Sequence, residues 1–552
     1  MTGASQSSGA ATDCCIKSRG RAAFPAPRHR AIRTGRAGTA EPEEFFVSLF
    51  ALRLLRAVVV PINCQMLPQD IGYVIQDAGL KHVVVCPPLL EKMPMLKNHP
   101  NLNCIITGAV DEAEAEAAFA PDQTPLPDFT PTTLQGDTDE LAFLVYTSGT
   151  SGHPKGVMLS EGNLLANIDG FVQVVDFGPD DRMVLALPLF HVYGLILGLA
   201  GLLAGAQITL IPNFSPKTIV EAMAAQQVTI LPLVPTLFGT LLKLVTRQTP
   251  PTRFRQLRFC VSGGASLPEA LLAQIESVLS TTVIEGYGLT ETSPVIAVNC
   301  PLHGSIPGCV GKPLPNVLVQ ITNDSGQPLP PNTEGEVWAK GGNVMLGYYN
   351  LPEATADTLT KDGWLKTGDL GHLDEAGHLF ITGRKKDLII KAGENISPRP
   401  IEEALHQHSA VAEAAAVGLP DDRLGERIAV FVSLTETAQT GPDAPDTKAL
   451  LQHCRDMLNP TYLPDELVIL DELPKNPAGK ILKKLLRQQH AARLAGHSPP
   501  VPVKTARSRK QRQGNGKTGK SAFSCRLANP AFGLLMGPTR LRSSCRMAQG
   551  LA

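Results

Sequence analysis

Apolar residues recur along most of the chain in two alternating patterns. Short apolar runs, typical of buried strands, are separated by segments whose apolar positions follow the helical repeat. The predicted strands lie at 58–62, 81–86, 103–106, 183–187, 207–211, 228–231, 257–261 and 282–285. The predicted helices include one that begins near residue 43 and others at 68–78, 215–226 and 268–279. Strands that alternate with helices predict a parallel sheet with helical crossovers.

The pattern changes twice towards the C-terminus. After Pro313, apolar alternation and turn residues predict hairpins, with strands at 317–322 and around 372–382, and we expect a small β-barrel there. From Asp387 the chain reads as α+β, with helices at 400–406 and 447–458 and strands at 410–417 and 428–434. The predicted fold class is α/β, with a large N-terminal domain of parallel-sheet subdomains plus the β-barrel, followed by a small α+β C-terminal domain.

One apolar segment, Met183–Pro212, is long enough to be weighed as a membrane span. It contains Pro188, His191 and Gln207, and glycines interrupt it repeatedly. A strand, a turn and a packed helix explain this composition better than a span does.

Charge is distributed unevenly. Residues 1–40 carry seven Lys or Arg and one Asp, and residues 497–552 carry eleven Lys or Arg and no acidic residue. The region 41–496 is therefore acidic, which argues against nucleic acid as a partner. The eleven cysteines are scattered without disulfide or metal-ligand spacing, and no signal peptide is recognisable, so reduced thiols and a cytoplasmic location are expected.

A glycine- and hydroxyl-rich loop follows the apolar run Leu141–Tyr146. It comprises Thr147, Ser148, Gly149, Thr150, Ser151 and Gly152, and Lys155 follows after Pro154. Converging backbone N–H groups, hydroxyls and one cation suit a polyphosphate, and Ser160 is placed to cap the next helix. It is not a Walker A loop, because Pro154 precedes the lysine and Gly156 follows it. A polar linker remains the alternative for this stretch alone.

The loop resembles the phosphate loop of the adenylate-forming superfamily, which includes acyl-CoA synthetases, peptide-synthetase adenylation domains and luciferases. Further strings resemble the family's motifs in family order across Leu141–Lys480, and the resemblance covers roughly 41–490. Such enzymes activate a carboxylate as acyl-AMP with release of pyrophosphate, and coenzyme A synthetases then transfer the acyl group to a thiol. The resemblance therefore implies ATP, Mg²⁺ and coenzyme A.

The same resemblance implies roles for individual residues. His191 lines the acyl pocket near the carboxylate, although taken alone it would be read as a core histidine. Tyr287 stacks on adenine, Thr290 contacts the α-phosphate, and Glu291 is the Mg²⁺ ligand, where a solvated loop carboxylate is the alternative. The glycine-rich walls beside the nucleotide are formed by Gly263, Gly264 and Ala265 and by Gly286 and Gly288.

The remaining implied residues lie towards the C-terminus. Asp369 matches the aspartate that accepts the ribose hydroxyls, and Arg384 matches the ribose-contacting arginine. Lys386 matches the hinge about which a mobile small domain turns. Lys480 matches the adenylation lysine. Gly393 matches the glycine that lines the thiol's approach, although Ala392 stands where many relatives have another glycine.

The strings GYGLTETSP and GRKKDLIIKAGENISP look most like those of bacterial fatty acyl-CoA synthetases. The stretch Tyr193–Ala206 is apolar and holds no charged residue, so a medium- or long-chain fatty acid is the expected substrate. Alternatives are a catalytically impaired homologue that binds nucleotide or acyl-adenylate, and acyl transfer to acyl carrier protein. No oligomeric state is predicted.

The resemblance also sets expected domain limits. These are a disordered or foreign segment at 1–40, a front-truncated AMP-binding domain at 41–385, a C-terminal domain at 386–496 and a basic disordered tail at 497–552. The basic tail would allow peripheral contact with an anionic inner membrane face. Because residues 1–40 resemble no part of the family, we expect a core strand to be lacking and the chain to express poorly.

Overall fold

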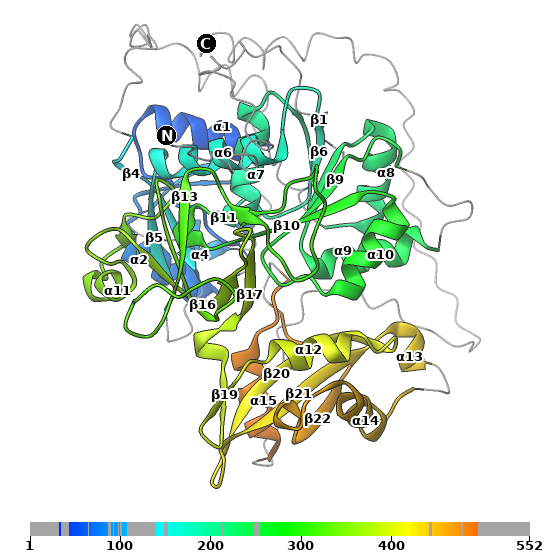
Figure 1. The fold of residues 1–552 in the computed structure, drawn as a ribbon. Coiled ribbons are helices and arrows are strands. Elements are labelled where there is room, and N and C mark those ends of the chain that lie inside the picture. Colours follow the sequence, from blue (N-terminus) through cyan, green and yellow to red (C-terminus); the bar gives the residue numbers. More distant parts are fainter. Residues whose placement is uncertain are drawn as a thin grey trace, which may run out of the picture. The chain divides into compact units, whose positions relative to one another are not determined.

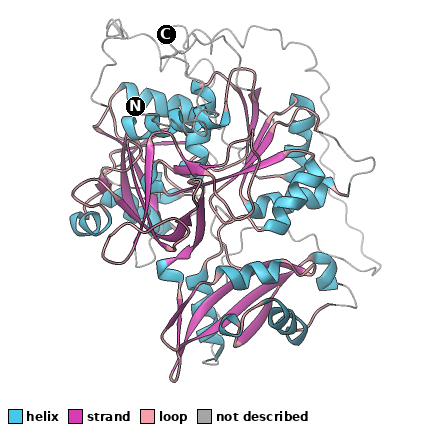
Figure 2. Ribbon diagram, in the orientation of Figure 1, coloured by secondary structure: helices cyan, strands magenta, loops and turns pink. Residues whose placement is uncertain are grey.

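Helices and strands alternate along most of the chain in the computed structural model (Figures 1 and 2). The described residues are 33–34, 43–64, 66–86, 90–91, 93–97, 99, 102–106, 138–147, 153–211, 214–247, 254–440, 444–475 and 479–494. The segments predicted to be disordered at 1–40 and 497–552 lie outside this set, apart from Arg33 and Thr34, which form a short strand. Among the described helices, none is long and apolar enough to cross a membrane.

A central eight-stranded sheet organises the N-terminal part, in the order β1-β7-β6-β8-β9-β10-β11-β12. Its strands are β1 (Arg33–Thr34), β6 (Arg182–Leu185), β7 (Gln207–Leu210), β8 (Ile230–Leu233), β9 (Phe259–Ser262), β10 (Thr282–Gly288), β11 (Val295–Val298) and β12 (Lys312–Pro313). The pairs from β1 to β10 are parallel, which confirms the predicted parallel sheet. β11 and β12 pair antiparallel and were not predicted.

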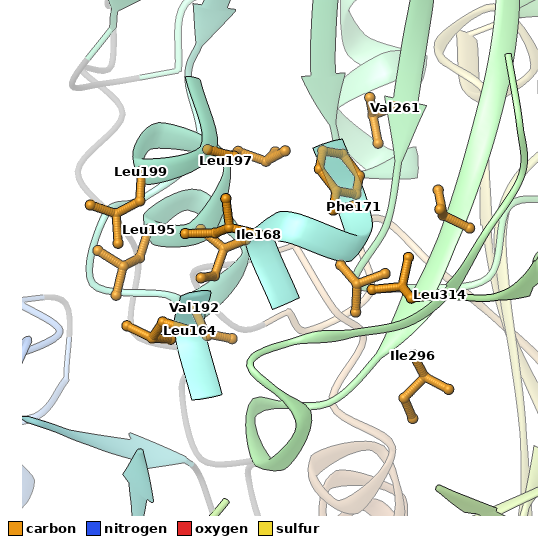
Figure 3. Packing of buried hydrophobic residues seen from close by; sticks show 14 of the residues in the cluster. Leu164, Ile168, Phe171, Val192, Leu195, Leu197, Leu199, Val261, Ile296 and Leu314 are labelled. Carbon is orange, nitrogen blue, oxygen red and sulfur yellow. The ribbon is translucent and has the colours of Figure 1, made fainter. Parts of the chain in front are cut away.

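The central sheet is covered on both faces, as its uninterrupted apolar strands require. Successive residues of β6 face opposite sides, so Met183 and Leu185 join one core while Val184 joins the other. The first core includes α6 (Glu161–Val175) and α7 (Val192–Leu203), whose side chains meet in Figure 3. The second core includes α8 (Pro216–Gln226), α9 (Pro235–Val245) and α10 (Glu269–Leu279). The segment weighed as a membrane span is thus β6, α7 and β7.

A smaller sheet, in the order β15-β5-β4, carries the predicted phosphate loop. It comprises β4 (Leu141–Thr147), β5 (Lys155–Ser160) and β15 (Gly347–Tyr348). The predicted strand at 58–62 is wrong: Val59 makes only an isolated parallel bridge to Phe143. Pro61 follows closely and has no N–H to extend the ladder, so pairing stops there.

Four elements that follow α1 (Glu43–Leu54) pack around their own apolar cluster. They are α2 (Pro68–Asp77), β2 (His82–Val85), α4 (Pro94–Lys97) and β3 (Asn103–Ile106). β2 and β3 form a parallel pair, and Ile71, Ile75 and Val85 are buried together between α2 and this pair. α1 belongs instead to the first core of the central sheet, through Phe46 and Leu49.

The region predicted to be a β-barrel is a four-stranded antiparallel sheet in the order β13-β14-β16-β17. It comprises β13 (Val317–Thr322), β14 (Gly335–Gly341), β16 (Leu365–Leu373) and β17 (Leu379–Arg384), with α11 (Pro352–Thr358) between β15 and β16. The two predicted hairpins are present, and β17 leads directly into the C-terminal part.

The C-terminal part is α+β, as predicted. Its sheet contains β18 (Ile389–Lys391), β19 (Glu394–Ile396), β20 (Val411–Asp421), β21 (Gly425–Leu434) and β22 (Glu466–Leu470). Its helical elements are η3 (Lys385–Asp387), α12 (Arg399–His406), α13 (Glu436–Thr440), α14 (Thr447–Met457), η4 (Pro460–Tyr462) and α15 (Lys483–Leu494). α12 and α14 cover one face of β20 and β21, and α15 covers the other.

A buried carboxylate ties together the amino ends of three central strands. Asp181, which precedes β6, accepts hydrogen bonds from Thr229 Oγ1 at 2.7 Å and from Gly178 N at 3.0 Å. Arg258 Nη1 lies 2.6 and 2.7 Å from its two oxygens. Thr229 and Arg258 directly precede β8 and β9, so one anion fixes the register at which these strands enter the sheet.

We predict that Asp181→Ala lowers the free energy of unfolding by about 2–3 kcal/mol, because it leaves several donors without their charged acceptor. Asp180→Ala is the matched control, since Asp180 is exposed, and it should change stability by less than about 0.5 kcal/mol. Urea-induced unfolding of both variants measures the difference. Equal stability of the two variants would contradict the assigned role of Asp181.

Candidate active site

The predicted phosphate loop connects two antiparallel strands. Thr147 and Lys155, at its two ends, are paired across β4 and β5, and Thr147 Oγ1 donates to the Lys155 carbonyl at 3.5 Å. Ser148, Gly149, Thr150, Ser151 and Gly152 lie outside the described residues. After β5, Ser160 Oγ accepts from Asn163 N at 3.0 Å and caps α6, as predicted. The ends of the loop are therefore fixed by strand pairing and by a capped helix.

Two contacts with α2 hold the strands beside this loop, and the sequence analysis did not identify them. Tyr146 O–H donates to Asp77 Oδ2 at 2.6 Å. The rings of Tyr73 and His153 are stacked, with centroids 4.4 Å apart. Burial and the Asp77 carboxylate raise the pKa of Tyr146, so its phenol remains a donor at neutral pH. α2 thus anchors the loop at both ends.

Glu291 lies in a single turn, η2 (Thr290–Thr292), between β10 and β11. Its side chain accepts a hydrogen bond from Tyr348 O–H at 2.7 Å, and its carbonyl accepts from Met345 N at 2.9 Å. Lys155 Nζ lies 4.9 Å from the centroid of the Tyr348 ring. The structure therefore brings the predicted Mg²⁺ ligand and the predicted phosphate-binding lysine to the same tyrosine.

Two buried asparagines fix the backbone on the C-terminal side of this turn. The Asn343 amide donates to the carbonyls of Thr292 at 2.9 Å and Val295 at 3.0 Å. The Asn167 amide, from α6, donates to the same two carbonyls at 3.2 and 2.7 Å. Both asparagines are fully buried, where an unpaired amide N–H group would be costly, so these paired N–H contacts strongly specify the conformation of the turn.

Tyr287, Asp369 and Arg384 converge from β10, β16 and β17. Tyr287 O–H donates to Asp369 Oδ2 at 2.7 Å, and Arg384 Nε lies 2.8 Å from Asp369 Oδ1. Asp369 is 1% exposed, and its Oδ1 nevertheless lacks a hydrogen bond of good geometry. Asp369 is therefore held between a neutral donor, Tyr287, and a cation, Arg384.

Two glycines of the predicted nucleotide walls, Gly263 and Gly288, lie so close to neighbouring atoms that a side chain would be crowded there. A Cβ at Gly288 would lie 1.7 Å from the Pro294 carbonyl oxygen, so only glycine allows β10 to turn into η2 here. A Cβ at Gly263 would lie 3.1 Å from the Tyr193 ring, whose O–H donates to the Val261 carbonyl at 3.3 Å. Gly264, Ala265 and Gly286 line the same cavity as Tyr287.

His191 caps the N-terminus of α7. Its Nδ1 accepts a hydrogen bond from Tyr193 N at 3.2 Å, so the neutral tautomer carries its proton on Nε2. Burial, and secondarily the charge of Lys480, lower the pKa of His191 to about 4. His191 is therefore an uncharged donor at neutral pH, and it lies close enough to Lys480 for the two groups to interact.

Lys480 lies among other charged groups, after the part of its loop that is not described. The side chain of Lys480 has solvent-exposed surface. Its pKa is nevertheless lowered to about 8, first by the desolvation that its dense surroundings cause and second by the charge of Arg384. Lys386, in η3, has a pKa lowered by burial and then by Arg384. Gly393 lies in the turn between β18 and β19, where an added Cβ would meet no described atom within 4 Å.

Some of these residues line a cavity of about 990 Å³, whereas Lys155, His191 and Glu291 are not part of its lining. Its lining includes Gly264, Tyr287, Asp369, Arg384 and Lys480. The pair of Asp369 and Arg384, the glycine walls and Lys480 fit a nucleotide. Among the described residues no group of three or more His, Cys, Asp or Glu could hold a metal ion by itself. A single carboxylate such as Glu291 fits Mg²⁺ only together with phosphate oxygens, which is how Mg²⁺ commonly binds nucleotides.

The sequence matches the AMP-binding enzyme family over residues 42–349 and that family's C-terminal domain over residues 400–480. The chain belongs to the AMP-binding enzyme family. Within this family it groups with acid–CoA ligases. It is 36% identical to a sulfoacetate–CoA ligase from Cupriavidus necator over 78% of this chain and 82% of that protein.

Other similar proteins act on different acids. A long-chain-fatty-acid–CoA ligase from Bacillus subtilis is 38% identical over 63% of this AMP-binding enzyme and 62% of that protein. A 2-succinylbenzoate–CoA ligase from Bacillus cereus is 34% identical over 81% of this chain and 86% of that protein. Family membership alone therefore leaves the acid undetermined.

Solved structures of the family share the fold. ATP-bound MatB from Rhodopseudomonas palustris aligns with a TM-score of 0.72 at 30% identity, over 84% of this chain and 90% of that one. The o-succinylbenzoate–CoA synthetase MenE from Bacillus subtilis, in complex with ATP and magnesium, aligns with a TM-score of 0.66 at 29% identity, over 80% and 86%. This AMP-binding enzyme thus has a large N-terminal and a smaller C-terminal domain, as predicted.

The neutrality of His191 predicts a specific dependence of stability on pH. Its pKa in the folded enzyme, about 4, lies below the ordinary value of 6.5, so the unfolded chain binds more protons as the pH falls through this range. His191→Asn keeps a capping side chain but does not titrate. Relative to this variant, the wild type should lose about 2 kcal/mol of unfolding free energy between pH 7 and pH 5. Urea unfolding at both pH values tests this, and a pH-independent difference would contradict it.

Proposed function

We propose that this chain is an ATP-dependent ligase that converts a medium- or long-chain fatty acid to acyl-AMP and then transfers the acyl group to coenzyme A. The observation that carries the proposal is the convergence of Asp369, Arg384 and Lys480 with the glycine walls on one cavity. A carboxylate is a poor acyl donor until one of its oxygens becomes part of a leaving group, and adenylation achieves this.

The first half-reaction joins two anions, so it needs positive charge. A carboxylate oxygen attacks the α-phosphorus of ATP, and pyrophosphate leaves. Lys480 is the proposed cation at this junction, and Thr290 and Lys155 are proposed to hold phosphate oxygens. Mg²⁺, held by Glu291, would neutralise part of the phosphate charge. Tyr287 and Asp369 are proposed to bind adenine and ribose, with Arg384 beside Asp369.

The second half-reaction consumes acyl-AMP. A thiolate of coenzyme A attacks the acyl carbonyl carbon, the bond to the phosphate oxygen breaks, and AMP leaves. We propose that the small domain turns about Lys386 between the two steps, which would remove Lys480 and bring Gly393 to the thiol. Acyl carrier protein is the alternative acceptor, because a phosphopantetheine thiol presents the same chemistry.

Helix α7, which begins directly after His191, favours an acid whose chain beyond the carboxylate is apolar. α7 carries no charged residue, and its helical stretch from Gly194 to Gly201 is buried. His191 is neutral, so it cannot balance a second anion. A sulfonate or a second carboxylate placed against α7 would lose its water without gaining a charged partner there.

The acid is tested by AMP release with purified enzyme, ATP, Mg²⁺ and coenzyme A. We expect kcat/KM for octanoate or palmitate to exceed that for 2-succinylbenzoate or sulfoacetate by at least about 100-fold, because an unpaired buried charge costs several kcal/mol. A preference for either dianion would overturn the fatty acid assignment. If none of the fatty acids supported AMP release, the ligase assignment itself would be overturned. Replacing coenzyme A with acyl carrier protein tests the alternative acceptor.

Lys480→Ala separates the two half-reactions. It should slow acyl-AMP formation by at least about 100-fold, because one cation that stabilises transition-state charge is removed. Thioester formation from supplied acyl-AMP should stay within about threefold of wild type, since the lysine has then left the site. Lys484→Ala, on the exposed first turn of α15, is the matched control. Equal loss in both half-reactions would contradict domain alternation.

A further inference from the structure

Tyr348 is a residue that none of the predicted motifs includes. It ends β15, whose pairing with β5 places Tyr348 opposite Val157, two residues after Lys155. Its N–H donates to Thr355 Oγ1 at 2.9 Å, and its side chain is almost completely buried in the first core of the central sheet. The backbone and the ring of Tyr348 are therefore fixed, and its hydroxyl has a defined position.

The hydroxyl of Tyr348 holds one oxygen of Glu291. The O–H donates to Glu291 Oε1 at 2.7 Å, the short distance expected for a charge-assisted hydrogen bond. An ionised carboxylate can only accept, so the phenol of Tyr348 is the donor. Only Oε1 takes part in this bond, so Tyr348 does not hold Oε2.

The ring of Tyr348 holds Lys155. Lys155 Nζ lies 4.9 Å from the ring centroid, within the range of a cation–π interaction. The same tyrosine therefore contacts a cation through its ring and an anion through its hydroxyl. The aromatic ring separates two opposite charges that come from β5 and η2, far apart in the sequence.

We propose that Tyr348 is a positioning residue for the magnesium–nucleotide complex, which keeps Lys155 and Glu291 apart and aims both at the phosphates. This inference rests on the proposed function, because it assigns Glu291 to Mg²⁺ and Lys155 to phosphate. Without the hydroxyl, Glu291 is free to turn towards Lys155. The direct ion pair that results would neutralise both groups, and the bound nucleotide would have to break it.

The two contacts of Tyr348 act on different parts of the ligand, so they can be separated. The hydroxyl acts through Glu291 and should matter only when Mg²⁺ accompanies the nucleotide. Tyr348→Phe removes this hydroxyl and keeps the ring beneath Lys155. A purely structural role for the hydroxyl would instead change the binding of ATP to the same extent with and without the metal ion.

The experiment measures ATP binding by isothermal titration calorimetry in Mg²⁺ and in EDTA. We expect Tyr348→Phe to weaken binding in Mg²⁺ by about tenfold, the usual effect of one hydrogen bond to a charged group. Binding in EDTA should stay within about twofold of wild type. Tyr462→Phe is the matched control, because it removes a phenol hydroxyl beside the apolar cluster of the C-terminal domain, and it should bind ATP like the wild type.

A double-mutant cycle tests whether Tyr348 acts through Glu291. Glu291→Gln removes the charge that the hydroxyl holds, so adding Tyr348→Phe to it should cost less than about twofold in Mg²⁺-dependent binding. A full tenfold cost in the Glu291→Gln background would overturn the inference. So would a Tyr348→Phe variant that binds magnesium–ATP like the wild type, or one that weakens equally in EDTA.

Wild-type binding distinguishes failure of the inference from failure of the proposed function. If the wild type shows no Mg²⁺-dependent ATP binding, both are overturned. If it shows such binding and Tyr348→Phe shows the same, only the role of Tyr348 is overturned. Thermal melting of each variant identifies a fold defect. If Tyr348→Phe shows one, Tyr348→Trp serves as the second variant, because it keeps an aromatic face for Lys155 without the phenol hydroxyl. Tyr348→Trp should reproduce the Mg²⁺-dependent loss of ATP binding.

Discussion

The structure depends on one buried anion, Asp369, and on how it is neutralised. A carboxylate that is 1% exposed is costly unless donors surround it, and Tyr287 and Arg384 come from two other strands to do so. These contacts link the last parallel strand of the central sheet to the antiparallel sheet that leads into the C-terminal part. The proposed nucleotide site therefore lies where two sheets must meet to satisfy a single charge.

Glu291 is a second carboxylate whose position is fixed by hydrogen-bond donors from distant segments. Its turn is held by neutral groups, with the amides of Asn167 and Asn343 on the backbone and the Tyr348 hydroxyl on the side chain. Neutral donors fix the geometry of an anion without cancelling its charge. A carboxylate held in this way keeps its affinity for a cation, whereas one paired with arginine or lysine would lose much of it. Rigid support and retained charge are both required of a Mg²⁺ ligand.

Much of the fold could be predicted because apolar runs report burial directly. The strand at 103–106 was predicted to the residue, and α2 and α8 each to within one residue at either end. The strand at 58–62 was wrong, because an apolar run shows burial but not whether a partner edge continues past Pro61. Motifs predicted roles for Glu291 and Lys155, which stay predictions, whereas Tyr348 and Asn167 act through contacts between distant segments. No local pattern encodes such contacts, and only the folded chain reveals them.

The cations of the site finally explain why it should bind an anion at all. The pKa values of Lys386 and Lys480 are lowered first by desolvation and then by the positive charge of Arg384. Asp369 and Asp387 offset this repulsion only partly. A phosphate chain or a carboxylate that enters the cavity relieves it, so part of the binding free energy comes from repulsion already present in the free protein. His191 is a neutral donor, so it adds no further electrostatic repulsion beside Lys480.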